Sequence, residues 1–466
     1  FPPIEGIKMS KLLNKAKQKH HAIRQLSYIL PLAACGGSEG TGSISQSTSR
    51  NVLLTGDAFI DGLNFGMKYD QQVLNISISG GMDGEYWVNA ASTLAYFEGI
   101  VDNTLKFTNV DYNVLGSFRN PEAAALAGAD ITLVPYITNS LDMPYGVLGF
   151  AYPVGFQNID EFASLPNLYD GIEGDIFLNF GGVLGDVNLS FEEGSEGYLL
   201  VLHELGHSLG LKHPHNTIGD QLSFSKYGTA EYDLDEFTVM SYNDNSNSYV
   251  SYDPITPMVL DVIALQFMYG KNQDIHSGNT VHEIVHTGAY YTIWDPSGVD
   301  TVDLTNSNWD WYVELPSVIA SSTHDEYIGF ALTDNGGSAP SDLVWLIGDI
   351  ENLKGGAGDD VLIGNHLDNI ISGGLGSDDI YSVGGNNTLI GGSGIDTFNI
   401  QLGGGYNVIQ DFSLSDDFWA ITDENWNNVG SLTWQEEITD HGDLIYVWYD
   451  NTTLVFEDLY ANSLLV

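Results

Sequence analysis

The chain has 466 residues, enough for about three domains of average size, and 43% of them are apolar, so it can bury a substantial core. It carries 14 Lys and Arg against 62 Asp and Glu, a formal net charge of -48. Such a chain repels phosphate backbones and anionic lipid head groups and attracts cations, so we expect no nucleic-acid partner. The single cysteine, Cys35, excludes an intrachain disulfide and a cysteine-based zinc finger.

The first 50 residues differ in charge from the rest of the chain. They hold seven of the 14 basic residues and only two acids, Glu5 and Glu39. Residues 36–49 are rich in Gly, Ser and Thr, which is typical of a flexible joint. We therefore expect residues 1–50 to be a leader or propeptide, removed by cleavage near residues 36–55 to give the active form.

Residues 26–35, LSYILPLAAC, follow a basic run and resemble a short export signal. Residues 32–35 resemble a lipoprotein cleavage box, so lipid attachment at Cys35 is one hypothesis; a propeptide helix with a chance tetrapeptide is the alternative. No other run approaches the ~20 apolar residues that span a membrane, so we expect a soluble body without a transmembrane segment.

After residue 50 the chain shows two different sequence patterns. Residues 51–270 mix alternating apolar segments with a helical one at 84–101, which predicts an α+β domain. The alternating segments are at residues 71–79, 129–137 and 174–180. From residue 271 to residue 466, short β-branched and aromatic runs are broken by Gly, Asp and Asn, which predicts an all-β domain.

Residues 196–215, EGYLLVLHELGHSLGLKHPH, carry leucines at helical spacing, which predicts a half-buried helix that Gly210 can end. His203 and His207 are four residues apart on one face, so both imidazoles can reach one metal ion. Glu204 can reach a water on that ion, and Gly210 lets the chain turn back with His213 as a third ligand. Three imidazoles leave an open position, as in a catalytic zinc site. The alternative, a buried helix with core histidines, does not require this spacing; we expect the other nine histidines, His215 included, at the surface.

Between residues 355 and 399 the chain repeats every nine residues, in the pattern G-G-x-G-x-D-x-U-x of the calcium-binding repeats of RTX parallel β-rolls. The U position is apolar in all five units and predicts the core of the roll. The glycines permit tight turns with carbonyl oxygens turned inward, and the Asp adds a carboxylate, a hard ligand that Ca²⁺ prefers. The predicted calcium ligands are Gly356, Gly358, Asp360, Gly374, Gly376, Asp378, Gly392, Gly394 and Asp396.

The repeats depart from this pattern in alternate units. Because two units make one turn, units one, three and five stack on one side and carry Asp at the sixth position. Units two and four carry Asn369 and Asn387 there, and unit two has Leu367 in place of a glycine. An amide oxygen ligates calcium without the charge that raises affinity. We therefore expect firmly bound ions on the Asp side and a weaker or incomplete row on the Asn side.

HELGHSLGLKH matches the metzincin zinc signature, and TVMSYND at 238–244 resembles the Met-turn that follows it. With the nonapeptides, the chain resembles the serralysins, secreted bacterial zinc endopeptidases with a C-terminal calcium β-roll. The resemblance implies an α+β metzincin protease domain followed by an all-β parallel β-roll domain, and one catalytic zinc. It implies the following roles: His203, His207 and His213 as zinc ligands, Glu204 as general base, Met240 as the apolar floor, and Tyr242 as a switchable zinc ligand that then stabilises the oxyanion. The alternative for Tyr242 is an ordinary core aromatic.

The resemblance also implies calcium at the junction of the two domains, on Asp295, Gly298, Asp300 and Glu351, although Pro296 and Ser297 replace the small residues usual there. Residues 452–466 resemble a type I secretion signal, which implies type I secretion machinery as a partner. We expect a secreted monomer acting on proteins and peptides, with the substrate as an added strand near residues 174–179.

Three alternatives remain at this point. The second hypothesis for Cys35 is that its thiolate binds the zinc ion and keeps the precursor inactive, because a thiolate is a good zinc ligand. A non-enzymatic RTX adhesin or surface module would share the repeats but has no use for the histidine motif. A polysaccharide-modifying enzyme with an RTX tail would need paired catalytic carboxylates on a repetitive β-scaffold.

Overall fold

The computed structural model describes residues 49–82, 86–87, 89–136, 148–156, 169–179, 190–218, 220–243, 253–319, 323–333, 340–423, 428–429, 434–438, 444–448, 452–457 and 459. The predicted leader up to residue 48, with Cys35, lies outside these residues, as does most of the predicted secretion signal. The last two residues of the predicted leader lie in β1 (Ser49–Asn51), which pairs antiparallel with β2 (Met67–Tyr69).

The N-terminal part is built on a five-stranded sheet of order β4-β3-β5-β7-β6. Four strands are parallel, and β6 runs antiparallel to β7. The strands are β3 (Val73–Ser79), β4 (Asp111–Phe118), β5 (Ile131–Tyr136), β6 (Gly149–Ala151) and β7 (Ile176–Asn179). The three predicted strands are therefore confirmed as β3, β5 and β7, and this part combines helices with a largely parallel sheet.

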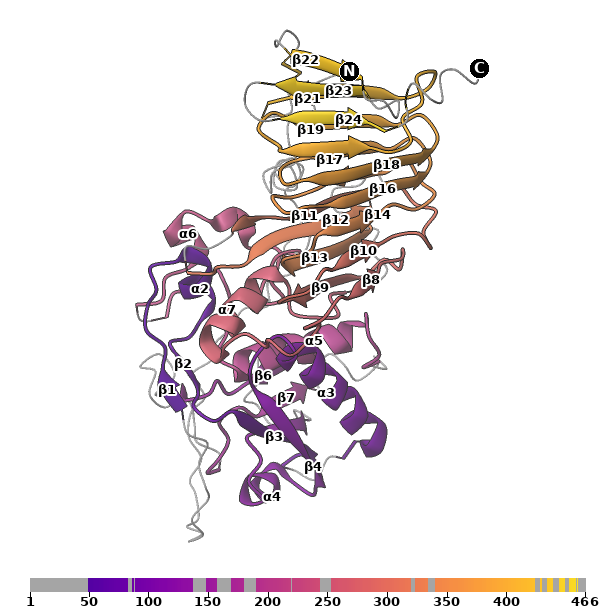
Figure 1. Cartoon of the computed structure of the whole chain (residues 1–466). Helices are drawn as coiled ribbons and strands as arrows, with labels where there is room; N and C mark the ends of the chain where they lie inside the picture. The colour runs from indigo at the N-terminus through magenta and orange to yellow at the C-terminus, as the bar shows by residue number, and fades with distance from the viewer. Residues whose placement is uncertain are drawn as a thin grey trace.

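Helices lie beside this sheet and between it and the β-rich part (Figure 1). They are α2 (Ala58–Leu63), α3 (Ala90–Leu105), α4 (Pro121–Leu126), α5 (Glu196–Ser208), α6 (Phe224–Tyr227), the short 3₁₀ helix η3 (Ala230–Tyr232) and α7 (Val259–Tyr269). The helix predicted at 84–101 begins later, at Ala90, and continues to Leu105. Among the described residues, no helix is long and apolar enough to cross a lipid bilayer.

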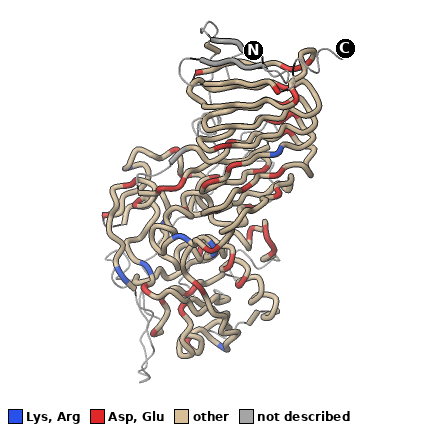
Figure 2. Tube along the Cα trace, in the orientation of Figure 1, with Lys and Arg blue, Asp and Glu red and all other residues tan. Residues whose placement is uncertain are grey.

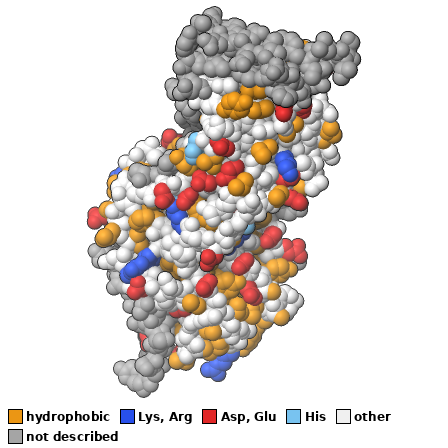
Figure 3. Space-filling view, in the orientation of Figure 1, with side chains coloured by type: hydrophobic (Ala, Val, Ile, Leu, Met, Phe, Trp, Pro, Cys, Tyr) orange, Lys and Arg blue, Asp and Glu red, His pale blue; other side chains and the backbone are white. Residues whose placement is uncertain are grey.

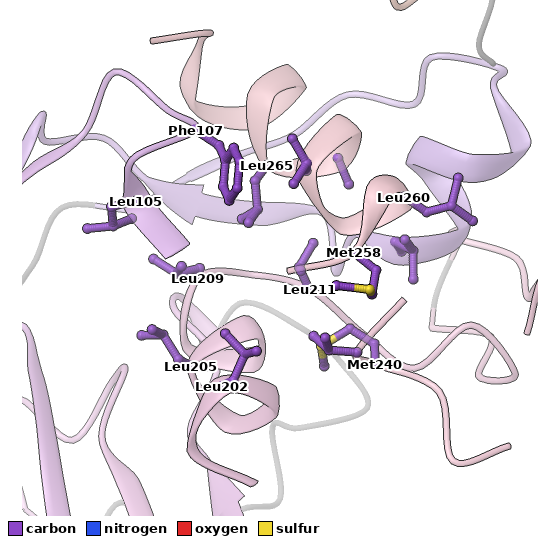
Figure 4. Close-up of a cluster of buried hydrophobic side chains, with 14 of the residues drawn as sticks. Leu105, Phe107, Leu202, Leu205, Leu209, Leu211, Met240, Met258, Leu260 and Leu265 are labelled. Carbon is purple, nitrogen blue, oxygen red and sulfur yellow. The ribbon is translucent and has the colours of Figure 1, made fainter. Parts of the chain in front are cut away.

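The core of the N-terminal part is packed between α5 and α7 (Figure 4). Leu202 and Leu205 project from α5 into the same cluster as Leu265 from α7 and Met258, the residue that caps α7, and all four side chains are buried. Apolar groups at helical spacing on two facing helices remove each other from water, at roughly 1.5–3 kcal/mol for each large side chain buried. This core fixes α5, the helix that carries the histidine motif.

The C-terminal part is a roll of two sheets (Figure 1). One has the order β22-β23-β24-β20-β18-β16-β14-β10-β8, and the other the order β21-β19-β17-β15-β11-β12-β13-β9. The parallel coil alternates between them. Its strands are β14 (Asn352–Lys354), β15 (Val361–Ile363), β16 (Ile370–Leu375), β17 (Asp379–Ser382), β18 (Asn387–Ser393), β19 (Thr397–Gln401), β20 (Tyr406–Ile409) and β21 (Phe418–Thr422).

The register of the coil follows the nonapeptide. Leu362 pairs with Ile380 and Ile380 with Phe398 in one sheet, while Ile371 pairs with Leu389 in the other. All five side chains are fully buried in one cluster. The predictions that the U position forms the core and that alternate units stack on opposite sides are therefore confirmed.

Both ends of the roll depart from a parallel coil. Near the N-terminal part, β11 (Trp311–Ile319), β12 (Tyr327–Thr333) and β13 (Asp342–Gly348) pair antiparallel. This end also contains β8 (Val281–Glu283), β9 (Tyr290–Asp295) and β10 (Thr301–Asp303). At the far end, β22 (Trp434–Ile438), β23 (Leu444–Trp448) and β24 (Thr453–Phe456) are antiparallel to one another.

The two parts share one core. Trp294 and Trp345, from β9 and β13, are buried in the same cluster as the leucines of α5. The indole N–H of Trp345 donates to the carbonyl of Glu236 at 2.7 Å, a bond between the parts. Acidic side chains are spread over both parts and basic ones are few (Figures 2 and 3).

Candidate functional site

The helix α5 is capped so that its histidines point to one place. It starts at Ser195, whose hydroxyl accepts the N–H of Tyr198, and the chain turns sharply after it at Gly210, where φ is 99°. A Cβ on Gly210 would lie 2.3 Å from the carbonyl oxygen of Met67, so no side chain fits there. This turn brings His213 back toward the helix, as the motif predicted.

The three predicted zinc ligands converge. The Nε2 atoms of His203 and His213 lie 3.1 Å apart, and those of His207 and His213 lie 3.0 Å apart. All three side chains are buried. Ligands on a tetrahedral zinc at 2.0–2.1 Å would lie about 3.3 Å apart, close to these separations.

The other ring nitrogens fix the tautomers. Nδ1 of His203 lies 2.7 Å from the carbonyl oxygen of Val239, and Nδ1 of His207 lies 2.8 Å from that of Leu211. A carbonyl only accepts, so both Nδ1 atoms carry the proton and both Nε2 atoms present lone pairs. Nδ1 of His213 lies 3.1 Å from the amide nitrogen of Asn216. Burial lowers the pKa of His203 to about 4 and that of His207 to about 3, so the rings are neutral, as metal ligands must be.

Glu204 is buried beside the trio. Burial raises its pKa to about 8, against a hydrogen bond from the backbone of Ala151. Its Oε2 is buried without a hydrogen-bond partner among the described residues. A Cβ on Gly149 would lie 3.2 Å from Oε1, so the carboxylate faces β6. A buried carboxylate of raised pKa next to metal-ligating nitrogens is suited to accept and return a proton.

The edge of the sheet nearest Glu204 is β6. The predicted docking strand, residues 174–179, contains β7, and β7 lies between β5 and β6. Both edges of β7 are therefore paired, and the prediction of an added strand there is wrong. Within the described residues, β6 is the edge strand on this side of the sheet.

Met240 lies under the histidines and is fully buried. A Cβ on Gly206, in the middle of α5, would lie 2.5 Å from Met240 Sδ, so the thioether packs directly on the helix backbone. Figure 4 places Met240 in the cluster with Leu202 and Met258.

Tyr242 lies against the same trio. Its ring centroid is 5.4 Å from that of His203, nearly parallel to it, and 4.4 Å from that of His213. The side chain is 42% exposed, so the alternative of an ordinary core aromatic is wrong. His215 stacks on His213 with an interplanar angle of 4° and also contacts the ring of Tyr242.

Asp261, on α7, was not among the predicted site residues. Its carboxylate accepts the hydroxyl of Thr238 at 2.5 Å and the backbone N–H groups of Val239 at 2.7 Å and Met258 at 3.0 Å. Val239 in turn offers its carbonyl to His203. Burial raises the pKa of Asp261 to about 7, and these three hydrogen bonds oppose the rise. The carboxylate thus fixes the Met-turn against α7 and, through Val239, orients the first histidine.

Lys212 was also missed, and it is fully buried next to His213. Its Nζ donates to the carbonyls of Gly62 at 2.6 Å, Asn216 at 2.8 Å and Leu222 at 3.2 Å. Three carbonyls satisfy the three donors of the ammonium group. The loop that carries His213 is therefore hydrogen-bonded to α2. The spacing of residues in the sequence does not predict this contact between Lys212 and Gly62.

The Asp side of the roll is a ladder of buried carboxylates. Asp378 Oδ1 accepts the N–H of Asp360 at 2.8 Å, and Asp396 Oδ1 accepts the N–H of Asp378 at 2.9 Å. The second oxygen of Asp378 is buried and has no partner among the described residues. A Cβ on Gly373 would lie 2.2 Å from it, so glycine leaves this space open. Burial, then the neighbouring carboxylates, raise the pKa of Asp378 to about 7 and that of Asp360 to about 6.

On the Asn side of the roll, the side-chain amides form hydrogen bonds with other protein groups. The amide nitrogen of Asn387 donates to the carbonyl of Gly384 at 2.7 Å and to Asn407 Oδ1 at 2.8 Å. Asn369 likewise donates to the carbonyl of Glu351 at 2.8 Å. Amide donors here occupy oxygen atoms that a cation would otherwise bind, which distinguishes this side from the ladder of carboxylates.

The junction residues predicted to bind calcium lie partly together. The backbone N–H of Asp300 donates to Glu351 Oε2 at 2.7 Å, and a Cβ on Gly298 would lie 2.5 Å from the Asp300 carboxylate. Asp295 instead has its Oδ2 at 2.7 Å from His282 Nε2. His282 and His324 are both buried, so the prediction of surface positions for the remaining histidines is wrong for these two.

Two buried imidazoles on a helix and a third after the turn that follows it form a group that could hold a metal ion, and their spacing with the adjacent glutamate is that of metallopeptidase zinc sites. The comparisons with known proteins agree. The chain is 31% identical over 231 residues to serralysin of Proteus mirabilis (45% of this chain, 44% of that protein) and 33% identical over 188 residues to serralysin of Photorhabdus luminescens (36% of each). It is 31% identical over 206 residues to metalloprotease AprA of Pseudomonas entomophila (40% of each).

The chain is thus similar to serralysin-type metalloproteases, and it aligns with less than half the length of these curated relatives. No family model matches it.

The first prediction concerns Asp261. Asp261→Ala leaves the buried N–H groups of Val239 and Met258 without an acceptor, which costs about 1–3 kcal/mol of unfolding free energy for each group. Because Val239 holds His203, we also expect zinc affinity to fall about 10–100-fold. Competition with a chromogenic chelator measures that affinity, and chemical denaturation measures stability.

Asp261→Asn should restore both properties, since its amide oxygen can accept the two N–H groups while its nitrogen donates to Thr238. Asp274→Asn, at an exposed carboxylate after the same helix, is the control. Equal loss of zinc affinity in the Ala and Asn variants would contradict the positioning role of Asp261.

The second prediction concerns pH. The folded pKa of Asp378 is raised to about 7, above the value of about 3.9 for an unfolded Asp, so between these values the folded state binds more protons. Without calcium, the roll should therefore become more stable as pH falls from about 7 to about 4. Thermal unfolding followed by circular dichroism in a chelator, at acidic and alkaline pH, measures this. Asp378→Asn should flatten the dependence; a calcium-free roll that loses stability over this range would contradict the prediction.

Proposed function

We propose that the chain is a secreted zinc-dependent endopeptidase that hydrolyses peptide bonds of protein substrates. The observation that carries this proposal is the convergence of the Nε2 atoms of three buried, neutral imidazoles close to Glu204, whose Oε2 is buried and has no partner among the described residues. The similarity to serralysins over part of the chain supports it. A non-enzymatic RTX module would gain nothing from burying these four polar side chains at the cost of their desolvation.

His203, His207 and His213 would hold the zinc ion. Three imidazole nitrogens, two of them in tautomers fixed by backbone carbonyls, fit a catalytic site with an open position. When bound, zinc supplies the Lewis acidity that polarises a peptide carbonyl and acidifies a water molecule. Met240 gives the trio an apolar support that excludes water from below.

Glu204 is the proton carrier of the proposed reaction. Its carboxylate takes a proton from the attacking water and delivers it to the nitrogen of the leaving amine. Its position between the histidines and β6 puts it on the side where a substrate would lie. The hydroxyl of Tyr242, at the exposed rim of the trio, would donate to the oxygen on which negative charge develops.

The substrate would pair with the edge of β6. Main-chain hydrogen bonds to an edge strand hold an extended peptide with little regard to its side chains, which suits a broad range of protein substrates. A peptide antiparallel or parallel to Gly149–Ala151 would pass beside Glu204.

The third prediction tests this mechanism. Glu204→Gln should keep zinc near one ion per chain but lower casein hydrolysis by about 10²–10⁴-fold, because it removes the base and leaves the ligands. His213→Ala should lose the metal. Tyr242→Phe should lower kcat by a smaller factor with little change in KM. Glu196→Gln, an exposed glutamate in the first turn of the same helix, is the matched control and should keep its activity.

Metal analysis and initial rates on the same preparations separate these outcomes. The wild-type activity should be abolished by o-phenanthroline and restored by zinc. Near-normal turnover by Glu204→Gln, or activity that resists the chelator, would refute the proposed mechanism.

We further propose that several calcium ions bind the Asp side of the roll, through the carboxylates of Asp360, Asp378 and Asp396 and the carbonyls of the adjoining glycines. The unpartnered buried oxygen of Asp378 and the space left by Gly373 support this. Burial, and then repulsion between neighbouring carboxylates, raises these pKa values; a cation offsets both effects, and binding only to the folded state stabilises that state. A further calcium ion would bind at the junction, on Gly298, Asp300 and Glu351; Asp295, expected as a fourth ligand, faces His282 instead.

The fourth prediction follows from the difference between the two sides. Asp378→Ala should abolish most of the gain in β-structure that calcium gives. Asn387→Ala should destabilise the roll to a similar degree with and without calcium, because it removes hydrogen bonds between protein groups. Calcium titrations followed by circular dichroism compare the variants. An equal change of calcium dependence in both would contradict the asymmetry.

Export through type I secretion machinery, removal of the leader and a monomeric state complete the proposal. These three points rest on the resemblance of the sequence to the serralysins.

A further inference from the structure

A second group of metal-binding side chains lies where the roll meets the N-terminal part. His276, His282 and Asp295 each offer one ligand atom, and these three atoms lie within 4.8 Å of one another. His282 and Asp295 are buried, and His276 is partly buried. His282 belongs to β8 and Asp295 ends β9, which are the terminal strands of the two sheets of the roll (Figure 1). His276 lies in the segment between α7 and β8.

The three groups are oriented toward one another. Nε2 of His282 lies 2.7 Å from Oδ2 of Asp295, and the rings of His276 and His282 lie 5.0 Å apart, nearly perpendicular. Nδ1 of His276 lies 2.9 Å from the carbonyl oxygen of Trp294, so this nitrogen carries the proton and Nε2 has the lone pair. The same bond from Nδ1 to a backbone carbonyl fixes His203 and His207 in the first site.

The backbone at His276 is unusual. Its φ is 49°, and among the described residues no other non-glycine residue has a positive φ. This conformation costs of order 1 kcal/mol or more and persists only where the surroundings determine it, which is frequent at ligand sites. Here it turns His276 toward His282 and Asp295.

The surroundings favour a cation. Asp295 and Asp300 are both fully buried, and Oδ2 of Asp300 has no hydrogen-bond partner among the described residues. Among the described residues, the ion-pair partner of Asp295 is His282. Buried carboxylates without a fixed positive charge are stabilised by a metal ion.

We propose that His276, His282 and Asp295 bind a transition-metal ion, Zn²⁺ in the first instance, at a site separate from the catalytic one. Two imidazole nitrogens and a carboxylate oxygen suit zinc, whereas calcium takes oxygen ligands. The ion replaces the hydrogen bond between His282 and Asp295. It joins the first strand of each sheet to the segment that leaves α7, and so fastens the roll to the N-terminal part. The site does not depend on the proposed peptidase function.

The experiment uses the full chain with His203→Ala and His207→Ala, so that the catalytic site holds no zinc. It is kept in saturating calcium, which occupies oxygen-rich sites, and then loaded with Zn²⁺ and desalted. We expect about one zinc ion per chain, falling to about none when His282→Ala is added. His286→Ala, at a partly exposed histidine of the same segment, is the matched control and should keep the ion. Cobalt loading should give the absorption of a tetrahedral site in the parent and not in the His282 variant.

A variant at His276 covers the case in which the loss of His282 prevents folding. His276→Asn keeps a residue that tolerates positive φ and removes the ring nitrogen. It should fold, unfold at the parent's temperature without zinc, and lose the rise in unfolding temperature that zinc gives the parent. Absence of zinc from the parent, or zinc content unchanged by either substitution, would overturn the proposal. Neither result bears on casein hydrolysis by the wild-type chain, so the two proposals fail independently.

Discussion

The structure depends on keeping three imidazoles neutral, buried and aimed at one point. Desolvation does the first, since it lowers the pKa of each ring. Backbone carbonyls orient two of the rings by accepting their Nδ1 protons: Val239, 36 residues away, serves His203, and Leu211, four residues away, serves His207. Much of the N-terminal core serves to hold those carbonyls still. Asp261 and Lys212 belong to this support, because each ties one such segment to a helix through a buried charged group.

The parts of the site that could be predicted from the sequence are those set by local spacing. His203, Glu204 and His207 follow from one helix, and His213 from a turn at Gly210 that only glycine permits. Asp261 could not be found this way, because its partners Thr238 and Val239 are 23 and 22 residues distant and no periodicity links them. The edge strand β6 was missed for a different reason: its three residues, Gly149–Ala151, are too few to show an alternating pattern.

The roll was predictable because every nine-residue unit repeats the apolar position that sets the register of its strands. Its ends were not, since the antiparallel strands β11 to β13 lack the repeat and are recognised only through pairing across the sheet. The same limit applies to His276 and His282. They are six residues apart in a strand region and become neighbours of Asp295 only when the two sheets meet, so the expectation that isolated histidines lie at the surface failed where tertiary structure decides.

The carboxylate ladder gives the roll a direction. Asp360 accepts the N–H of Trp311, Asp378 that of Asp360, Asp396 that of Asp378, and Asp417 that of Asp396. Each turn thus adds a carboxylate that docks on an amide already in place. A system of this kind behaves as a one-dimensional chain of nearest-neighbour couplings, in which each turn is stabilised by the turn next to it. The series begins at Trp311, whose neighbour Tyr312 packs against the shared core, so the N-terminal part stabilises the first turn of the coil.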